Sequence, residues 1–389
     1  MTKTLYKNAQ VFTGKNEEFT AGFNFVVDDE TGIFTQDEQV DQTIDLAGQY
    51  VMPGMINAHT HIVADPYAKI AQLGSPDATA PTATFLALSN LQKLLADGVT
   101  YIRDVGSVSD VDLELAALER QGDLFAPGII ASGSPLTMTG GHFSEAAYEV
   151  DGVDEVRKYA RVLLKKGVDN IKLMATGGVS FNGETPHDIQ LTEPELKAAV
   201  EEAHHKGRTA NAHAQGTVGI QNALRAGVDS VEHAVYLDDE TIDMFLQKGT
   251  YIVPTLAAPW AINQNTEQLP DFMVEKSLGL EKAHIKSIGK AAQAGVKLAM
   301  GTDSGTAFNN FDKNSSLELE LMVNAGATNL QVLQAATINA ANLLQVADRA
   351  GTIEPNKFAD FIVLADNPLA DIKAIQKEKT VYKKGKEVK

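Results

Sequence analysis

Two rhythms of hydrophobic and polar positions divide the chain. Between residues 50 and 349, short apolar runs alternate with longer amphipathic segments. A short apolar run is typical of a buried strand, and apolar residues at intervals of three and four are typical of a helix with one buried face. The pattern therefore predicts eight strand–helix units. We expect the strands at residues 50–61, 99–105, 128–133, 168–174, 208–213, 228–233, 250–255 and 296–303, and the helices at residues 83–97, 111–121, 151–166, 193–206, 216–226, 239–248, 272–294 and 314–346.

Glycine marks the joints between these units. In six places a glycine follows a predicted helix and precedes an apolar run. Glycine is favoured where a helix ends in a left-handed residue, so each position predicts a helix-to-strand turn. The run Thr192-Glu193-Pro194-Glu195 is a capping box with proline in the first turn, which predicts a helix start. The six glycines are Gly98, Gly167, Gly207, Gly227, Gly249 and Gly295.

Strict alternation of strands and helices predicts parallel strands. Eight units of each kind favour a closed (β/α)8 TIM barrel. An open doubly wound sheet is the alternative, but it usually has fewer units and a glycine-rich fingerprint, which this chain lacks. The fold class is therefore expected to be α/β, with a TIM barrel at its centre.

The two ends of the chain follow a different, strand-and-turn pattern. Each end is too short to bury a core of its own, so pairing them into one small β-sandwich is the simplest solution. The sequence thus predicts a β-sandwich domain from residues 1–55 plus 350–389, and a barrel domain from residues 56–349.

Composition and charge then narrow the function. The 389 residues include 33 Lys and Arg against 51 Asp and Glu, a formal charge of −18, and no Cys. Without Cys there is no disulfide, zinc ribbon or Cys nucleophile, so a metal site has to use His and carboxylates. The acidic balance argues against a nucleic-acid partner.

The first residues and the length of the apolar runs indicate where in the cell the protein is expected. The first residues, MTKTLYKNAQVFTG, contain no apolar stretch of the kind found in signal peptides. No apolar run approaches the roughly 20 residues that span a bilayer. We therefore expect a cytoplasmic protein with no membrane contact.

Polar residues that bind metals cluster at the ends of predicted strands. His59 and His61 are two apart on the first strand, so both side chains point to the same side. A single His at a strand end is more often a hydrogen-bonded core residue, but several on the same face of a barrel favour a metal site, and imidazoles favour zinc or a similar ion. The predicted ligands are His59, His61, Lys172, His213, His233 and Asp303.

Lys172 is the unusual member of this set, because an ammonium repels cations. It could instead be a base with a lowered pKa. Alternatively, reaction with CO₂ would make it an N6-carboxylated, anionic bridge between two metal ions. That bridge would explain how four His and one Asp suffice for two ions.

These residues, in this order, resemble the amidohydrolase superfamily of binuclear metallohydrolases. The run from Met52 to His61 (MPGMINAHTH) is similar to that superfamily's His-x-His motif, although Asn57 stands where many members carry Asp. Residues 351–354 (GTIE), 359–364 (ADFIVL) and 367–369 (NPL) resemble the superfamily's return into its β-sandwich. The resemblance covers nearly the whole chain.

Further motifs resemble the group of Xaa-Pro dipeptidase-like enzymes and imidazolonepropionase relatives. The resemblance implies one metal held by His59, His61, Lys172 and Asp303, and a second held by Lys172, His213 and His233. Imidazolonepropionase lacks the bridging Lys, so Lys172 favours the peptidase-like side. The His-x-x-Glu run of the deaminase branch is absent, since His213-Ala214-Gln215-Gly216 stands there. The motifs are GVT (98–100), RDVG (103–106), GGH (140–142), IK (171–172), GGV (177–179), VEH (231–233), VPTL (253–256) and MGTDSG (300–305).

The resemblance also implies a reaction and its participants. Two divalent ions, expected to be Zn²⁺, would activate water for attack on an amide carbonyl, while Asp303 carries the proton to the leaving nitrogen. His142 and Tyr236 match positions that contact the substrate carboxylate or carbonyl. Members of the group often assemble, so a homo-oligomer is compatible with the resemblance.

The expected substrate is a dipeptide, with Xaa-Pro dipeptidase or carboxypeptidase-like preference. A cyclic amide, an N-acyl amino acid or a carbamate is the first alternative. A metal-binding assembly protein without catalysis is the second, and the intact ligand set argues against it.

The other polar candidates receive structural interpretations. His204 and His205 end a helix, where a positive charge suits the helix dipole. His284 lies in the long predicted helix before the last strand, and His187 could reach the pocket edge. Arg103 and Asp104 are expected to form a buried hydrogen-bonded pair.

Overall fold

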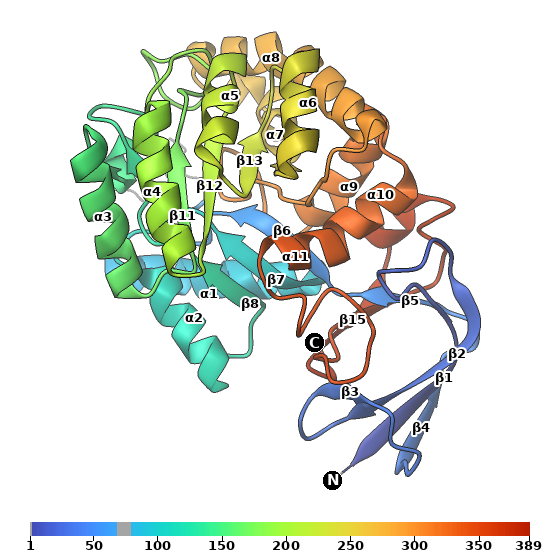
Figure 1. Ribbon diagram of the computed structural model, residues 1–389. Helices are drawn as coiled ribbons and strands as arrows, with labels where there is room; N and C mark the ends of the chain where they lie inside the picture. Colours follow the sequence, from blue (N-terminus) through green and yellow to red (C-terminus); the bar gives the residue numbers. More distant parts are fainter. Residues whose placement is uncertain (1, 68–78) are drawn as a thin grey trace.

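The computed structural model describes residues 2–67 and 79–389. Figure 1 shows a large α/β body and a smaller β unit below it, with both ends of the chain in the smaller unit. In the described part of the chain, no helix is both long and apolar enough to cross a membrane.

Strands from both ends of the chain share one sheet of eight. The order is β17-β16-β15-β5-β1-β2-β3, and β4 pairs with β1. β5 joins the two ends, because it runs parallel to β1 and antiparallel to β15. In its core Tyr6 stacks on Phe25, and Phe361 meets Phe25 edge-on. The two-layered sandwich form and the domain boundaries stay predictions. The strands are β1 (Lys3–Val11), β2 (Thr20–Asp28), β3 (Ile33–Thr35), β4 (Gln42–Asp45), β5 (Tyr50–Pro53), β15 (Phe361–Leu364), β16 (Lys379–Lys383) and β17 (Lys386–Glu387).

The body is built on parallel strands, as the alternating pattern predicts. One sheet has the order β10-β9-β11-β12-β13-β14 and the other the order β6-β7-β8. Every neighbouring pair in both sheets is parallel. The strands are β6 (Met55–Thr60), β7 (Val99–Asp104), β8 (Gly128–Ala131), β9 (Leu136–Thr137), β10 (Tyr148–Glu149), β11 (Asn170–Met174), β12 (Thr209–Ala214), β13 (Ser230–His233) and β14 (Tyr251–Val253).

The predicted strand at 50–61 is two strands rather than one. β5 pairs with the terminal sheet, whereas β6 pairs with β7 in the body. The chain passes from one sheet to the other at Gly54, where a Cβ atom would lie 2.4 Å from the Thr100 side chain. Only glycine allows this close approach, so the change of sheet is built into the sequence.

The predicted eighth strand, 296–303, is not a regular strand. Leu298 and Ser304 form isolated parallel bridges with Ile252 and Thr60. Asp303 has a φ of 60°, which is left-handed and incompatible with a continuing ladder. This segment therefore lies between β14 and β6 with few strand bonds, and full closure of the barrel stays a prediction.

Most helices lie where the sequence predicts them. All six joint glycines have positive φ, between 64° and 95°, which confirms the predicted turns. The Thr192 capping box is also present. The helices up to the last predicted one are α1 (Ala80–Ala96), α2 (Val111–Gln121), α3 (Val153–Lys166), α4 (Glu193–His205), α5 (Thr217–Ala226), α6 (Asp239–Lys248), α7 (Ala257–Gln264) and α8 (Asp271–Ala294), with short 3₁₀ turns at Ser144–Ala146 and Thr266–Gln268.

The last predicted helix, 314–346, is wrong as a single helix. Gly326 ends the first piece with a φ of 119°, and Thr328 starts the next with its own capping box. The pattern also missed α7, because its run AAPWAINQ lacks a clear amphipathic period. The pieces are α9 (Asn314–Ala325), α10 (Asn329–Gln334), a π-helical turn (Ala335–Asn339) and α11 (Ala340–Leu343), and a 3₁₀ turn (Ile372–Gln376) follows later.

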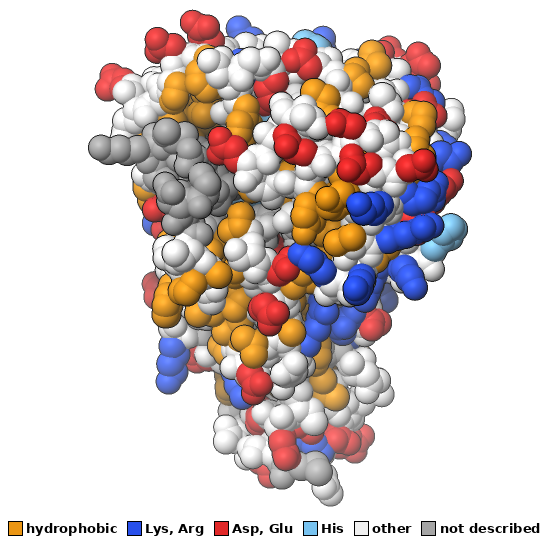
Figure 2. All heavy atoms as spheres, turned by 90° about the vertical axis from the view of Figure 1, so that its left-hand side faces the viewer, with side chains coloured by type: hydrophobic (Ala, Val, Ile, Leu, Met, Phe, Trp, Pro, Cys, Tyr) orange, Lys and Arg blue, Asp and Glu red, His pale blue; other side chains and the backbone are white. Residues whose placement is uncertain are grey.

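Helices on the outside of the body are joined by ion pairs. Arg157 and Arg161 of α3 both bind Glu202 of α4, at 2.9 and 2.8 Å. Figure 2 shows Lys and Arg side chains gathered in one area of the face beside these helices, with acidic side chains elsewhere on it. The net charge of −18 is therefore spread unevenly over the surface.

Candidate metal centre

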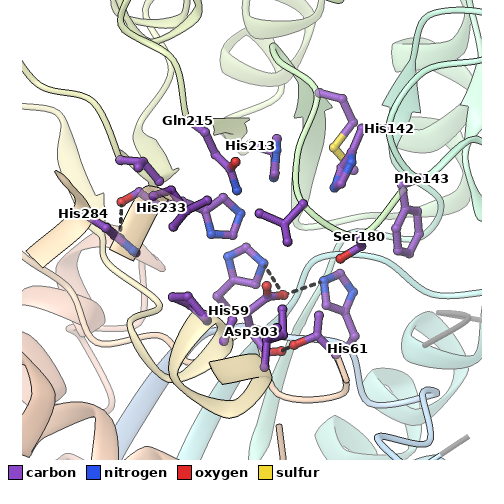
Figure 3. A pocket seen from close by; sticks show the side chains of 18 of the residues that line it. His59, His61, His142, Phe143, Ser180, His213, Gln215, His233, His284 and Asp303 are labelled. Atoms are coloured by element: carbon purple, nitrogen blue, oxygen red, sulfur yellow. Dashed lines mark hydrogen bonds and ion pairs between the residues drawn. The ribbon is translucent and has the colours of Figure 1, made fainter. Parts of the chain in front are cut away.

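All six side chains that the sequence predicts as metal ligands line one pocket. It lies at the carboxyl ends of the parallel strands and holds about 680 Å³ of empty space up to its open mouth. Figure 3 shows the imidazoles turned toward one another around this space. His59 and His61 come from the end of β6, Lys172 from β11, His213 from β12, His233 from β13 and Asp303 from the segment before Ser304.

Asp303 lies between the two imidazoles of the His-x-His pair. Its Oδ1 is 3.2 Å from the Nε2 atoms of both His59 and His61. Ligand atoms of the three residues all lie within 4.8 Å of one another. Burial opposes ionisation of Asp303, but the two imidazoles outweigh it and hold its pKa well below the usual range. An ionised carboxylate and two nitrogens thus face one point.

The remaining imidazoles extend this group across the pocket. The ring centres of His59 and His233 are 5.2 Å apart, and those of His233 and His213 are 4.5 Å apart. Burial lowers the pKa of His61, and it lowers the pKa values of His213 and His233 well below the usual range. These rings are therefore neutral at pH 7, which is the form that binds metals.

Hydrogen bonds on the outer side fix the His-x-His rings. His59 Nδ1 lies 2.6 Å from Glu232 Oε2, and His61 Nδ1 lies 3.3 Å from the carbonyl oxygen of Gly106. A ring that donates its Nδ1 proton outward presents Nε2 to the site. Gly106 has no room for a side chain, because a Cβ there would lie 3.0 Å from His61 Nδ1.

The two other rings are held in opposite senses. His233 Nδ1 lies 2.6 Å from Thr255 Oγ1, so its Nε2 faces the pocket. His213 instead bonds the Gly177 carbonyl through Nε2, at 3.2 Å, which leaves its Nδ1 for the pocket. The rings therefore present a mixed set of nitrogens, and each tautomer is assigned by its outer partner.

Lys172 lies buried in the same wall. Its ammonium makes no hydrogen bond or ion pair within residues 2–67 and 79–389, although the side chain is only 1% exposed. Burial lowers the pKa of Lys172 to about 8, against the attraction of Glu232 and Asp303. A pKa of about 8 leaves most of this amine protonated at pH 7, but its neutral, reactive fraction is far larger than that of an exposed lysine.

Left-handed backbone conformations occur at three positions of the site. His233, Thr255 and Asp303 have φ values of 72°, 54° and 60°. Such conformations are costly for β-branched residues such as threonine. They cluster at functional sites, where the surrounding structure holds them in place. Consecutive residues of a regular strand point to opposite faces. The left-handed turn at His233 breaks this alternation, so the side chains of Glu232 and His233 both lie at the site.

The donor set suits divalent metal ions. Neutral imidazole nitrogens and carboxylate oxygens are ligands of zinc and related ions. Each imidazole considered above has an outer partner that fixes which nitrogen faces inward, as expected at a metal centre. The residues present therefore fit the predicted group, with His59, His61 and Asp303 as the most compact set.

Arg103 is not paired with Asp104, which corrects the sequence prediction. Its guanidinium instead binds Glu232, with 2.9 Å between Nη2 and Oε1. Asp104 accepts a hydrogen bond from the backbone of Ile62 at 2.9 Å. Consecutive residues of a strand point to opposite faces, so the two side chains cannot meet. Arg103 thus supports His59 through Glu232.

Replacing Glu232 with glutamine should weaken metal binding by about 10- to 100-fold. Its carboxylate accepts from both His59 and Arg103, whereas an amide can accept from only one of them. Burying Arg103 without its counter-ion should also cost about 3–5 kcal/mol of stability. Competition with a chromophoric chelator measures the first effect, and urea unfolding measures the second.

Glu193→Gln is the matched control for this variant. Glu193 forms a half-exposed pair with Arg225 at 2.7 Å, where the contribution to stability is at most about 1 kcal/mol. Unchanged metal affinity in Glu232→Gln would show that His59 does not depend on its outer partner.

The two predicted substrate contacts are placed differently. His142 lines the pocket and stacks on His213, with ring centres 4.2 Å apart. Tyr236 is outside the lining, and its ring packs against His187 at 4.6 Å. Its contact with substrate stays a prediction. His284 lines the pocket wall and donates to the backbone oxygen of His233 at 2.9 Å.

Sequence reasoning missed several residues that shape the site. Glu232 had a signal, since it lies in the VEH motif beside a ligand. Thr255 lies in the VPTL motif, but its contact with His233 spans two strands. Gln215 and Glu184 lie in loops, and neither residue type is distinctive there.

Comparisons with known proteins agree with this geometry. Residues 50–388 match the Amidohydrolase family. The chain is 33% identical over 363 residues to the ochratoxinase of Aspergillus niger, covering 85% of this chain and 73% of that protein. The crystal structure of a Xaa-Pro dipeptidase with bound methionine is 29% identical, covers 99% of both chains and has a TM-score of 0.89. The structure of a prolidase complexed with N-methylphosphonate-L-proline is 28% identical, covers 100% of both chains and also has a TM-score of 0.89.

These matches confirm the resemblance that the sequence motifs carry. The family match spans most of the chain, and the structural matches extend over the strands that present the imidazoles. Peptide and amide hydrolases stand among the relatives. The chain belongs to the amidohydrolase family and is a hydrolase that acts on carbon–nitrogen bonds.

Proposed function

We propose that this protein is a binuclear metal-dependent dipeptidase built on a closed (β/α)8 barrel with a terminal β-sandwich. Two divalent ions, proposed as Zn²⁺, would share an N6-carboxylated Lys172. His59, His61 and Asp303 would complete one site, and the remaining two imidazoles, His213 and His233, the other. The observation that carries the proposal is the convergence of all six side chains on one pocket.

The metal ions would supply Lewis acidity, which lowers the pKa of a water molecule and polarises the scissile carbonyl. The protein's own residues do the remaining work. Asp303 Oδ1 faces His59 and His61, so Oδ2 is left to accept a proton from the attacking water and return it to the leaving nitrogen. Without that transfer the amine is a poor leaving group, and the amide would re-form.

The pocket walls fit a small substrate with one apolar part. Val179, Val235, Ile262 and Leu280 form an apolar wall, and His142 provides a polar contact on another side. Similarity to a Xaa-Pro dipeptidase and to a prolidase supports a dipeptide as the substrate. His142, which lines the pocket, would bind its terminal carboxylate.

A second substrate class is favoured by the ochratoxinase similarity. That relative matches 85% of this chain, and its name does not describe a peptidase. N-acyl amino acids share with dipeptides an amide bond beside a carboxylate, so the same residues could act on both. They therefore belong in the same panel of substrates.

Zinc-loaded protein should hydrolyse members of a panel of dipeptides, Xaa-Pro included, and N-acyl amino acids. We expect amidation of the terminal carboxylate to lower kcat/KM by about 10- to 100-fold, because a hydrogen bond to a charged group is lost. Chromatography of the released free amino acid measures the rate of the reaction.

Dialysis against a chelator serves as the control, and zinc should restore the activity that the chelator removes. Equal rates on free and amidated substrates would remove the carboxylate contact from the proposal. A metal-loaded protein inactive on the whole panel would contradict the assignment of substrate class.

A further inference from the structure

The loop after β11 places a carboxylate behind His142. Glu184 Oε1 lies 2.5 Å from His142 Nδ1 and accepts the backbone N–H of Gly178 at 2.9 Å. Its other oxygen accepts the side-chain amide of Gln190, also at 2.9 Å. The Glu184 side chain is only 12% exposed, so these contacts take place away from bulk water. Both oxygens of the carboxylate are therefore engaged.

Gln190 completes a closed set of contacts. Its Oε1 accepts the backbone N–H of His142 at 2.8 Å and the hydroxyl of Thr137 at 3.2 Å. His142 is thus held at its backbone by Gln190 and at its ring by Glu184. We call His142, Glu184 and Gln190 the His142 clamp.

Close packing leaves the His142 ring little freedom. A Cβ atom on Gly178 would lie 2.7 Å from His142 Cε1, and one on Gly141 would lie 2.7 Å from Gln190 Oε1. His213 stacks on one face of the ring, and Phe181 meets it edge-on at 5.2 Å. The glycines of the GGH and GGV motifs therefore make room for the clamp.

We propose that Glu184 is a positioning residue for substrate binding, acting through His142. Glu184 engages Nδ1, so Nε2 is the ring nitrogen left for the substrate, and a ring that donates to both Glu184 and a substrate carboxylate carries a proton on each nitrogen. Figure 3 shows His142 on the pocket wall beside His213, between that ring and Phe143. Glu184 itself lies behind the wall and outside the lining of the pocket. This inference rests on the proposed function, in which His142 binds the terminal carboxylate of the substrate.

Glu184→Ala should raise KM for a dipeptide with a free carboxylate by about 10- to 100-fold, the range expected for a lost charged hydrogen bond. We expect kcat to change less than about threefold, since binding away from the reacting atoms is lost equally in ground and transition states. The amidated dipeptide should show no change in KM. Steady-state kinetics on both substrates measures the split.

Glu184→Gln keeps an oxygen for His142 and Gly178 but replaces the acceptor of the Gln190 amide with a donor, so it should recover only part of the loss in KM. Glu149→Ala is the matched control, because Glu149 is exposed and its side chain binds, among residues 2–67 and 79–389, only the backbone N–H of Gly140, at 2.6 Å. In a His142→Ala background, Glu184→Ala should have no further effect. A KM unchanged by Glu184→Ala, an equal loss on both substrates, or a loss that persists without His142 would each overturn the proposal.

Nitrogen NMR of the His142 ring tests the clamp without turnover. In the metal-loaded wild type, both Nδ1 and Nε2 should carry protons, and in Glu184→Ala a single proton should exchange between the two nitrogens. If the wild type hydrolyses no dipeptide, the proposed function fails. The NMR result still tests whether Glu184 fixes the protons on the His142 ring. A single exchanging proton on the wild-type ring would overturn the clamp.

Discussion

Asp303→Asn should lower kcat by about 10²- to 10⁴-fold while leaving most of the bound metal in place. Asparagine keeps an oxygen where Asp303 Oδ1 lies, 3.2 Å from both imidazoles of the His-x-His pair. It cannot accept a proton at the second position, because that atom becomes an amide nitrogen. Single-turnover kinetics with metal analysis of the same sample measures both quantities.

The carboxylate has to be ionised before it can accept this proton. Burial would protonate Asp303, yet His59 and His61 hold its pKa well below the usual range. The group is therefore available as a base throughout the neutral range of pH. A change in the pH profile alone, without loss of kcat, would indicate that another group carries the proton.

Asp312→Asn is the matched control for Asp303. Asp312 is exposed and lies nine residues further along the same part of the chain. We expect wild-type kcat and metal content from it. A near-normal rate in Asp303→Asn would remove this residue from its proposed role.

The convergence of the six proposed ligands on one pocket could be predicted from the sequence because it depends on local rules. His59 and His61 are two apart on one strand, and His213, His233 and Asp303 end predicted strands whose carboxyl ends meet. The conclusion needs only strand direction and the period of two. For the same reason the glycine turns were predictable, since each depends on one residue's backbone.

The partners of the ligands could not be predicted in this way. Glu232 meets His59 across 173 positions of the sequence, and Glu184 meets His142 from a loop with no periodic pattern. The left-handed turns at His233 and Asp303 break strand alternation, so the face on which a neighbour lies is no longer fixed by counting. These contacts follow from tertiary packing, which overrides local preference.

Asp303 and Lys172 differ in how the surrounding residues hold them. The carboxylate is held by residues that are themselves fixed, so its role depends on placement. Lys172 has no acceptor within the described residues, so its proposed role depends on chemical modification of its amine. In the proposed step, the neutral amine attacks CO₂, an N–C bond forms, and one proton leaves to solvent, which yields an anionic carbamate.

Lys172→Ala should lose metal and nearly all activity. Replacing an outer partner of a metal ligand already costs about 10- to 100-fold in affinity, so loss of a shared ligand should exceed that range. Metal analysis after gel filtration and hydrolysis of the best dipeptide measure the two losses. Lys165→Ala, an exposed change on the preceding helix α3, should match the wild type.

Rescue distinguishes a bridging carboxylate from a lysine base. The cavity in Lys172→Ala should admit a short carboxylic acid such as propionate, which together with added zinc should restore part of the activity. Lys172→Met fills the same space without an amine, so the acid should not restore it. A carboxylate can replace a bridging carbamate, whereas an amine can replace a lysine that acts as a base. Rescue of Lys172→Ala by an amine but not by propionate would therefore show that Lys172 acts as a base.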